Sequence, residues 1–237
     1  MGKRIISQRR GKGSLTYKYP GHRFSNPFGY PKTEEKLIGV VREIIKEPSH
    51  SAPTALVKFD NTNNITSIPA KLNLRENDVV SYNDNNGNAA LKILKLKDIS
   101  EGTEIYNIES TPGDGGKFCR AGGVTASILF KSKDYILVKL PSKKERKFNP
   151  DCKATLGIIA AGGKGEKPIL KAGKRHHIMR AKNKLYPKTS GVAMNAVDHP
   201  FGSGRGRHVG KPKTPKKNAP PGRNVGSIRA KRTGWKR

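Results

Sequence analysis

Short apolar runs separated by polar turn clusters occupy the middle of the chain. The runs are about 4–8 residues long and rich in β-branched residues, which is typical of strands. Clusters rich in Asn and Asp at residues 60–64 and 83–88 favour turns between them. A first group of predicted strands covers residues 37–45, 54–59, 79–82 and 89–96. A second group covers residues 105–108, 125–130, 135–140, 146–148 and 155–160.

A break near residues 98–102 separates the two groups of predicted strands. The polar residues 131–134 between two apolar runs predict a hairpin. Short strands with turn signals every ~8–12 residues favour small barrels over an α/β fold. The only plausible helix is short and basic, at residues 174–184. We therefore predict an all-β protein with two small barrels and long irregular extensions at both ends.

Apolar content falls away towards both ends of the chain. Ile, Leu, Val and Phe make up about a quarter of residues 33–165 and about a seventh of the rest. Below roughly 20% of such residues, a highly charged segment buries too little apolar surface to offset its ordering entropy. We therefore expect the middle to fold by itself and the ends to be extended arms that order only on a partner.

The positive charge is concentrated in the same two end segments. The chain has 48 Lys and Arg against 18 Asp and Glu, a formal net charge of +30. Residues 1–32 hold eight basic and no acidic side chains, whereas residues 166–237 hold twenty basic and two acidic ones. Residues 33–100 are balanced, with nine of each sign. So large an excess indicates a polyanionic partner such as a nucleic acid, with an affinity that falls steeply with salt.

Other classes of protein fit the sequence poorly. The longest apolar stretches fall far short of the ~18–20 residues of a membrane span, and the first residues lack the apolar run of a secretory signal. Cys119 and Cys152 are too few for a disulfide framework and too far apart for a zinc pair. We expect a cytoplasmic protein without a membrane partner or a metal site.

Glycine-rich loops recur at residues 112–116, 121–123 and 161–165. They are either tight turns between strands or places where backbone N–H groups meet phosphate oxygens. Tight turns are the more common use of such loops, and the basic neighbours Lys117, Arg120 and Lys164 add some weight to the second interpretation. None of the loops is a nucleotide-binding P-loop, because Gly116-Lys117 is followed by Phe118 and not by Ser or Thr.

The histidines do not form a recognisable catalytic or zinc motif. His176 and His177 are adjacent and have no Cys or carboxylate nearby, so they suit RNA contacts better than zinc. Asp198 and His199 are the one carboxylate–imidazole neighbour pair in the basic tail. They suggest either a general base or a turn through residues 198–202, and the missing nucleophile motif favours the turn.

One signature is specific enough to indicate a family. Residues 191–200 read GVAMNAVDHP, and three further runs precede them in order: PGDGGK at 112–117 with RAG at 120–122, DCKATLG at 151–157, and LKAG at 170–173. Together they closely resemble the universal ribosomal protein L-two family of the large ribosomal subunit. Ala196 and Phe201 stand where the bacterial form has Pro and His, so the chain looks archaeal in type.

The resemblance implies an OB-fold barrel followed by an SH3-like barrel, with arms that penetrate large-subunit ribosomal RNA. The implied organisation is a basic extension at 1–34, an OB-fold at 35–98, an SH3-like barrel at 99–172 and a basic extension at 173–237. It further implies a role in subunit association, tRNA binding and the architecture of the peptidyl transferase region. The motif histidine of the family falls on His199, and an RNA-contacting arginine of the second barrel falls on Arg120.

The basic segments and the resemblance together define a set of predicted RNA-binding residues. In the N-terminal arm they are Lys3, Arg4, Arg9, Arg10, Lys12 and Arg23, and in the glycine-rich loop Lys117 and Arg120. In the C-terminal arm they are Lys174, Arg175, His176, His177, Arg180, Lys182, Asn195, His199, Arg205, Arg207, His208, Lys211, Lys213, Arg229, Lys231 and Arg232. Asn195, Asp198 and His199 are those expected near the peptidyl transferase region.

The expected partners follow from the same resemblance. They are large-subunit ribosomal RNA, neighbouring large-subunit proteins and, through an intersubunit bridge, the small subunit. We expect no homo-oligomer, no catalytic residue and no cofactor other than Mg²⁺ held by the RNA. Two rival hypotheses are a non-ribosomal nucleic-acid binder and an RNA-processing enzyme that uses Asp198 and His199.

Overall fold

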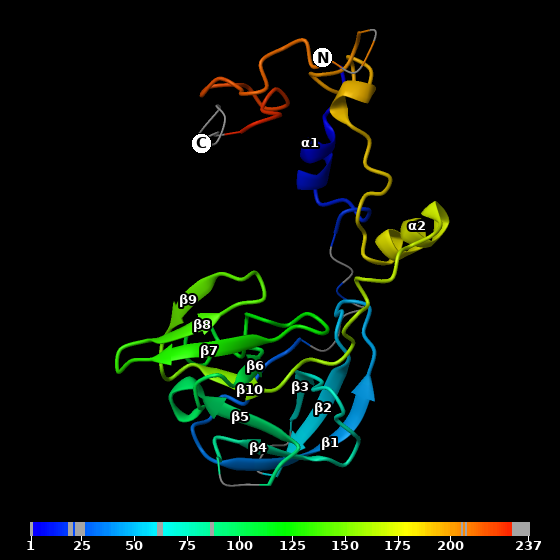
Figure 1. The fold of residues 1–237 in the computed structure, drawn as a ribbon. Helices are drawn as coiled ribbons and strands as arrows, with labels where there is room; N and C mark the ends of the chain where they lie inside the picture. The colour runs from blue at the N-terminus through cyan, green and yellow to red at the C-terminus, as the bar shows by residue number, and fades with distance from the viewer. Residues whose placement is uncertain are drawn as a thin grey trace. The chain divides into compact units, whose positions relative to one another are not determined.

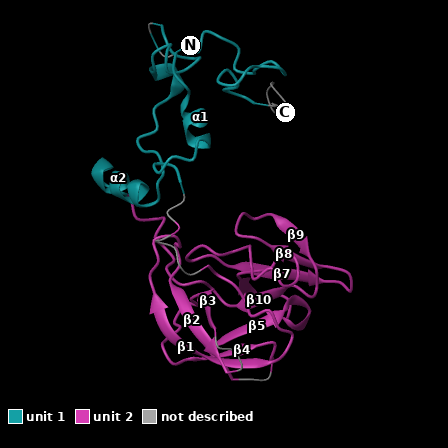
Figure 2. Ribbon diagram, turned by 180° about the vertical axis from the view of Figure 1, so that it is seen from behind, with its two compact units in different colours: residues 1–20, 169–237 teal, residues 21–168 magenta. Residues whose placement is uncertain are grey.

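The computed structural model describes residues 2–18, 21, 27–60, 64–85, 88–204, 206 and 208–228. The chain divides into two compact units (Figure 2): unit 1 consists of residues 1–20 and 169–237, and unit 2 of residues 21–168. Unit 2 holds the strands, and unit 1 holds the basic ends of the chain.

Unit 2 is built on one sheet of ten strands (Figure 1), which confirms the all-β prediction. The strands are β1 (Leu37–Ile45), β2 (Thr54–Phe59), β3 (Ile65–Pro69), β4 (Val79–Tyr82), β5 (Leu91–Lys95), β6 (Glu104–Tyr106), β7 (Ala126–Lys131), β8 (Ile136–Lys139), β9 (Glu145–Phe148) and β10 (Lys153–Leu156). Their order is β3-β2-β1-β4-β5-β10-β6-β7-β8-β9. Only the β4–β5 pair is parallel among these neighbours.

Most strands lie where the apolar pattern predicts them. The runs 37–45, 54–59 and 79–82 match β1, β2 and β4, and the hairpin across residues 131–134 is the antiparallel β7–β8 pair. The pattern misses β3, because its sequence ITSIP mixes Thr and Ser with two Ile and ends in proline. Proline is tolerated there because β3 is an edge strand.

Four predicted strands are too long, and one of them, 135–140, exceeds β8 by only one residue at each end. The run 89–96 shortens to β5 because Leu96 begins a 3-10 helix, η2 (Leu96–Asp98). The run 105–108 is wrong at its end, since β6 stops at Tyr106 and Ile108 forms a lone bridge to Phe118. The run 155–160 is wrong beyond Leu156, where Gly157 adopts a φ of 111° that a continuing strand does not allow.

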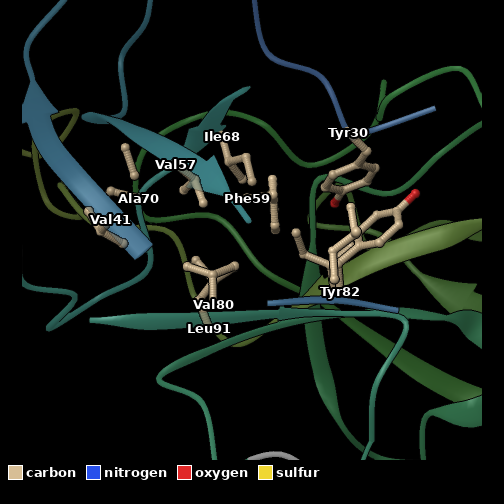
Figure 3. Packing of buried hydrophobic residues seen from close by; sticks show 12 residues of the cluster. Tyr30, Val41, Val57, Phe59, Ile68, Ala70, Val80, Tyr82 and Leu91 are labelled. Atoms are coloured by element: carbon tan, nitrogen blue, oxygen red, sulfur yellow. The ribbon is translucent and has the colours of Figure 1, made fainter. Parts of the chain in front are cut away.

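Two hydrophobic clusters lie on either side of β5. Ile93 belongs to the first and Leu94 to the second, because successive side chains of a strand point to opposite faces. Figure 3 shows the first cluster, in which Val57 and Ile68 face Val80. The split between the clusters therefore falls within β5, a few residues before the predicted break at 98–102. The barrel boundaries 35–98 and 99–172 stay a prediction.

Two buried tyrosines bind the segment before β1 to both halves of the sheet. The Tyr30 hydroxyl donates to Asn107 O at 2.7 Å and lies 2.6 Å from Thr155 Oγ1 on β10. The Tyr82 hydroxyl lies 2.7 Å from Pro31 O, and the Lys153 ammonium donates to that hydroxyl at 2.6 Å. These contacts place residues 30–33 against the sheet.

Replacing Tyr30 with Phe should lower the free energy of unfolding by about 1–3 kcal/mol. The change keeps the buried ring but leaves the Asn107 carbonyl and the Thr155 hydroxyl without this partner. Urea denaturation of the full chain measures the loss. Tyr135→Phe is the matched control, since the Tyr135 ring is half-buried and contacts Lys147. Equal unfolding midpoints for the two variants would show that the Tyr30 hydroxyl contributes nothing.

Unit 1 contains short helices and turns. They are α1 (Ile6–Gly11), α2 (Ala172–Ala181) and a 3-10 helix, η3 (Gly191–Ala193). The prediction of a single helix at 174–184 is wrong in two respects. The helix α1 exists, with the Ile5 N–H bonded to the Gln8 side chain at 3.1 Å, and α2 ends early because Asn183 has a φ of 49°.

The two ends of the chain contact each other within unit 1. The Asn183 side-chain amide donates to Leu15 O at 3.2 Å and to Lys18 O at 2.8 Å. Lys3 and Asp198 form an ion pair at 3.6 Å. The sequence pattern does not indicate these contacts between the two ends, and the expectation that the arms order only on a partner stays a prediction. Within the ranges that the structure describes, no helix is long and apolar enough to cross a membrane.

Candidate nucleic-acid interface

Helix α2 carries the densest group of predicted RNA-binding residues. None of its residues is buried, and its few apolar side chains do not gather on one face of the helix. Five predicted residues on it are exposed, namely Lys174, Arg175, His176, His177 and Arg180, and Lys182 at the C-cap is exposed too. A helix without a buried face gains little from packing on the protein, so the cations of α2 lie free for contacts outside the chain.

The local contacts of α2 order some of these side chains. The Arg175 guanidinium lies 5.8 Å from the centre of the Tyr186 ring, and the rings of His176 and His177 meet edge to face at 5.6 Å. Arg180 in the last turn of α2 interacts favourably with the negative end of the helix dipole. The first turn has no acidic residue to interact with the positive end. A phosphate group near that turn would supply the missing negative charge.

The predicted cations of the N-terminal arm are also exposed. Lys3, Arg4, Arg9, Arg10 and Lys12 all have exposed side chains. Arg9 Nε donates to Arg4 O at 3.0 Å, which closes the turn before α1. The Lys3–Asp198 pair joins two partly exposed groups, so it adds little stability by itself.

The signature residues 191–203 form a compact loop held by backbone hydrogen bonds. The N–H groups of Asp198 and His199 both donate to Asn195 O, at 3.0 and 3.2 Å. Ser203 N donates to Met194 O at 3.2 Å and closes the loop. A Cβ at Gly191 would overlap the His199 imidazole. Glycine is needed at position 191 because the ring lies against its backbone.

The His199 side chain has a defined tautomer. Phe201 N donates to His199 Nδ1 at 3.0 Å, so in the neutral ring the proton lies on Nε2. Partial burial lowers the pKa of His199 below the ordinary value of a histidine. The neighbouring Asp198 carboxylate contacts Lys3 instead. The turn interpretation of residues 198–202 is thus favoured over the general base.

The imidazole of His199 should titrate below the ordinary pKa of histidine. Burial disfavours the charged ring, so the loop loses stability as the pH falls through the pKa of the unfolded chain towards the lower folded one. Proton NMR of the full chain measures the titration, with a synthetic peptide of residues 191–203 as the unfolded reference. A His199 pKa equal to or above that of the peptide would contradict the burial of the ring.

The glycine-rich loop of unit 2 is organised by two carboxylates. Asp114 accepts hydrogen bonds from the backbone N–H groups of Ser110 at 3.0 Å and Gly116 at 3.0 Å. The buried Glu109 accepts from Gly115 N at 3.1 Å and from Lys153 N at 2.8 Å. The backbone N–H groups of Gly115 and Gly116 are therefore both used in hydrogen bonds within the protein.

Gly122 and Gly123 lie where two loops approach each other closely. Gly122 N donates to Ser51 Oγ at 3.0 Å, and Gly123 N donates to Ile159 O at 3.2 Å. A Cβ at Gly123 would overlap the backbone of Gly162. For Gly115, Gly116, Gly122 and Gly123, the interpretation as turns and close approaches is favoured over phosphate-binding amides.

Arg120 lies at the edge of these loops and is half-buried. Its Nη1 donates to Gly116 O at 3.0 Å, and its guanidinium lies 5.1 Å from the centre of the Phe28 ring. Phe28 stacks in turn on His50 with a ring separation of 3.8 Å. A guanidinium has five N–H donors, so the contact with Gly116 leaves donors for a second acceptor. The exposed Lys117 lies in the same loop.

No sequence motif indicates that Phe28 and His50 lie beside Arg120. They lie 92 and 70 positions before Arg120 in the chain, so no local spacing relates the three. Ser51, which supports the second glycine loop, follows His50 directly. The adjacent residues His50 and Ser51 therefore lie against Phe28, which supports Arg120, and against the loop at Gly122.

The remaining predicted residues fall in two groups. His208, Lys211, Lys213 and Asn195 are exposed, and Lys211 Nζ donates to Pro200 O at 3.3 Å. The others lie outside the described residues: Arg23, Arg205, Arg207, Arg229, Lys231 and Arg232.

The described part of the chain contains no candidate metal site, and its two cysteine thiols are unreactive. No group of three or more His, Cys, Asp or Glu there could hold a metal ion. Cys119 and Cys152 are both free thiols. Burial raises the pKa of each to about 11, so both stay protonated at neutral pH.

Comparison with known proteins gives consistent matches. The family described as "Ribosomal Proteins L2, C-terminal domain" matches residues 87–219. A protein of Archaeoglobus fulgidus named "Large ribosomal subunit protein uL2" is 48% identical over 238 residues, covering all of both chains. Proteins with the same name from Methanothermobacter thermautotrophicus and Haloarcula marismortui are 46% and 44% identical, over at least 98% of each chain.

Proposed function

Since this chain belongs to the universal ribosomal protein L-two family in its archaeal type, we propose that it binds large-subunit ribosomal RNA through unit 1 and the Arg120 loop. Membership of the family makes it a structural protein of the large ribosomal subunit and part of the translation machinery. The finer role that we propose is to support subunit association, tRNA binding and the architecture of the peptidyl transferase region.

The observation that carries the RNA-binding proposal is the exposed, unbalanced charge of unit 1. Helix α2 buries none of its residues, and residues 199–237 contain no Asp or Glu. Cations that lack acidic partners gain most from phosphate groups, because binding releases the counterions of the RNA. Such contacts position the protein on RNA without reading much sequence.

Unit 2 supplies the rigid part of the proposed interface. The Arg120 guanidinium lies over the Phe28 ring, which stacks on His50, and it donates to Gly116 O. A guanidinium supported in this way suits a phosphate oxygen. In unit 1, the His199 Nε2–H group is a donor for a phosphate or a 2′-hydroxyl. We propose an architectural role for His199 and no catalytic one.

The remaining parts of the proposal concern the setting of the protein. We propose that it acts in the cytoplasm as one chain within the large subunit, beside neighbouring proteins of that subunit. An intersubunit bridge would connect it to the small subunit. Mg²⁺ would contribute only through the RNA.

Sedimentation of a cell extract tests the proposed function. A tagged copy of the chain should migrate with the large subunit on a sucrose gradient and stay there at moderate salt, because many phosphate contacts act together. A fivefold rise in salt on purified RNA alone should release it. A chain found mainly in the free fraction or with chromosomal DNA would support the non-ribosomal rival instead.

A further inference from the structure

The C-terminal part of unit 1 encloses a pocket of about 330 Å³. Apolar groups form most of its wall: Pro200, Phe201, Pro212, Pro215, Pro220 and Val225. Four of these six are prolines, whose fixed φ angles limit how far the wall can rearrange. The predicted RNA-binding set includes none of them.

Contacts between separate segments of the tail lie beside this pocket. Ser227 N donates to Lys213 O at 2.8 Å, and Lys211 Nζ donates to Pro200 O at 3.3 Å. A Cβ at Gly226 would overlap Lys213 O and lie 3.0 Å from the Phe201 ring, and Gly226 has a φ of 90°. Glycine at this position allows the two segments of the tail, around residues 213 and 226, to approach each other closely.

The charges at the pocket select the kind of ligand. Lys211, Lys216 and Arg223 contribute to its lining, and the tail beyond Asp198 holds no acidic residue that could neutralise them. An apolar wall disfavours a buried phosphate, whereas cations at its edge favour one outside. A ligand with an apolar part joined to negative charge would therefore suit the pocket.

We propose that this pocket holds one unstacked nucleobase of RNA, while Lys211, Lys216 and Arg223 contact the phosphates on either side of it. Unpaired bases commonly stack on aromatic and apolar side chains, which suits Phe201 and the proline rings. Asn218 and Thr214 in the lining can donate to or accept from the edge of the base. The volume lies at the small end of the ~300–1,000 Å³ typical of ligand pockets, which suits a single nucleoside.

Filling the pocket without changing its charge tests this proposal, which rests on the proposed RNA binding. Ala219→Trp places an indole in the lining, and Phe201→Ala removes the stacking surface. Base-specific chemical modification of the RNA in large subunits carrying each variant is the measurement. The same one or two nucleotides should gain reactivity roughly 5- to 100-fold in both variants, because stacking on the protein is lost.

Asn224→Trp is the matched control, because Asn224 is exposed and lies outside the lining. It should leave the modification pattern of the RNA unchanged. Unchanged nucleotides in Phe201→Ala subunits would overturn the proposal, as would a photo-crosslinker at position 219 that captures an acidic protein segment and no RNA. If Ala219→Trp fails to enter the subunit, Phe201→Ala still tests the stacking, since it adds no bulk.

The failure of this inference differs from the failure of the proposed function. If the unaltered protein protects no ribosomal RNA at all, the proposed function is wrong. If it protects RNA along α2 and the arms while neither pocket variant changes any nucleotide, only the nucleobase pocket is wrong.

Discussion

Replacing Lys174, Arg175, Arg180 and Lys182 together with Gln should weaken binding to large-subunit ribosomal RNA by roughly 10²- to 10³-fold near physiological salt. All four side chains are exposed on α2 or its C-cap. Each phosphate contact that is lost should also reduce the slope of log affinity against log salt by about 0.7–0.9. Gln is a good helix former, so α2 is retained. Filter binding of the full chain over a salt series measures both effects.

A control with the same loss of charge separates α2 from net charge. Lys133, Lys139, Lys143 and Lys144 are exposed around the β7–β8 and β8–β9 turns, and no part of the proposed interface includes them. Changing these four to Gln should alter the salt dependence much less. An equal loss of affinity in both quadruple variants would show that overall charge, and not the position of α2, determines binding.

Replacing Gly116 with Val should lower the free energy of unfolding of unit 2 by about 2–5 kcal/mol. Gly116 has a φ of 92°, and a Cβ there would lie 2.6 Å from Asn107 Cγ. Asn107 is fully buried and its backbone carbonyl accepts the Tyr30 hydroxyl, so it cannot move aside cheaply. Urea denaturation followed by circular dichroism measures the change.

Gly165→Val is the control for this substitution. Gly165 also ends a glycine-rich loop, but a Cβ there would meet nothing within 4 Å and its φ is not positive. The control should unfold within about 0.5 kcal/mol of the unaltered chain. If the two variants lose similar stability, the close approach of Gly116 to Asn107 does not constrain the fold.

Local patterns in the sequence account for most of the strands. Runs such as LIGVVREII and TALVKF place β1 and β2 correctly, because β propensity and turn signals act over a few residues. The same reasoning misses β3, whose pairing with β2 compensates for its weak pattern. It also extends β10 too far, because the positive φ of Gly157 interrupts an otherwise continuous apolar run.

The candidate site was only partly accessible to the same reasoning. The exposed cations of α2 and the arms were predictable, since charge and apolar content are properties of the segment itself. The contact of Asn183 with Leu15 and Lys18 was not, because those bonds join residues about 165 positions apart.

The amino-acid sequence by itself determined that this is an all-β protein with two basic ends, and its motifs indicated the family. Only the tertiary structure decided how individual side chains are used. It directs the amides of Gly115 and Gly116 to carboxylates of the protein, and it stacks Arg120 on Phe28. Contacts of this kind join residues that are distant in the chain, and their free energy depends on burial and distance, which no local pattern encodes.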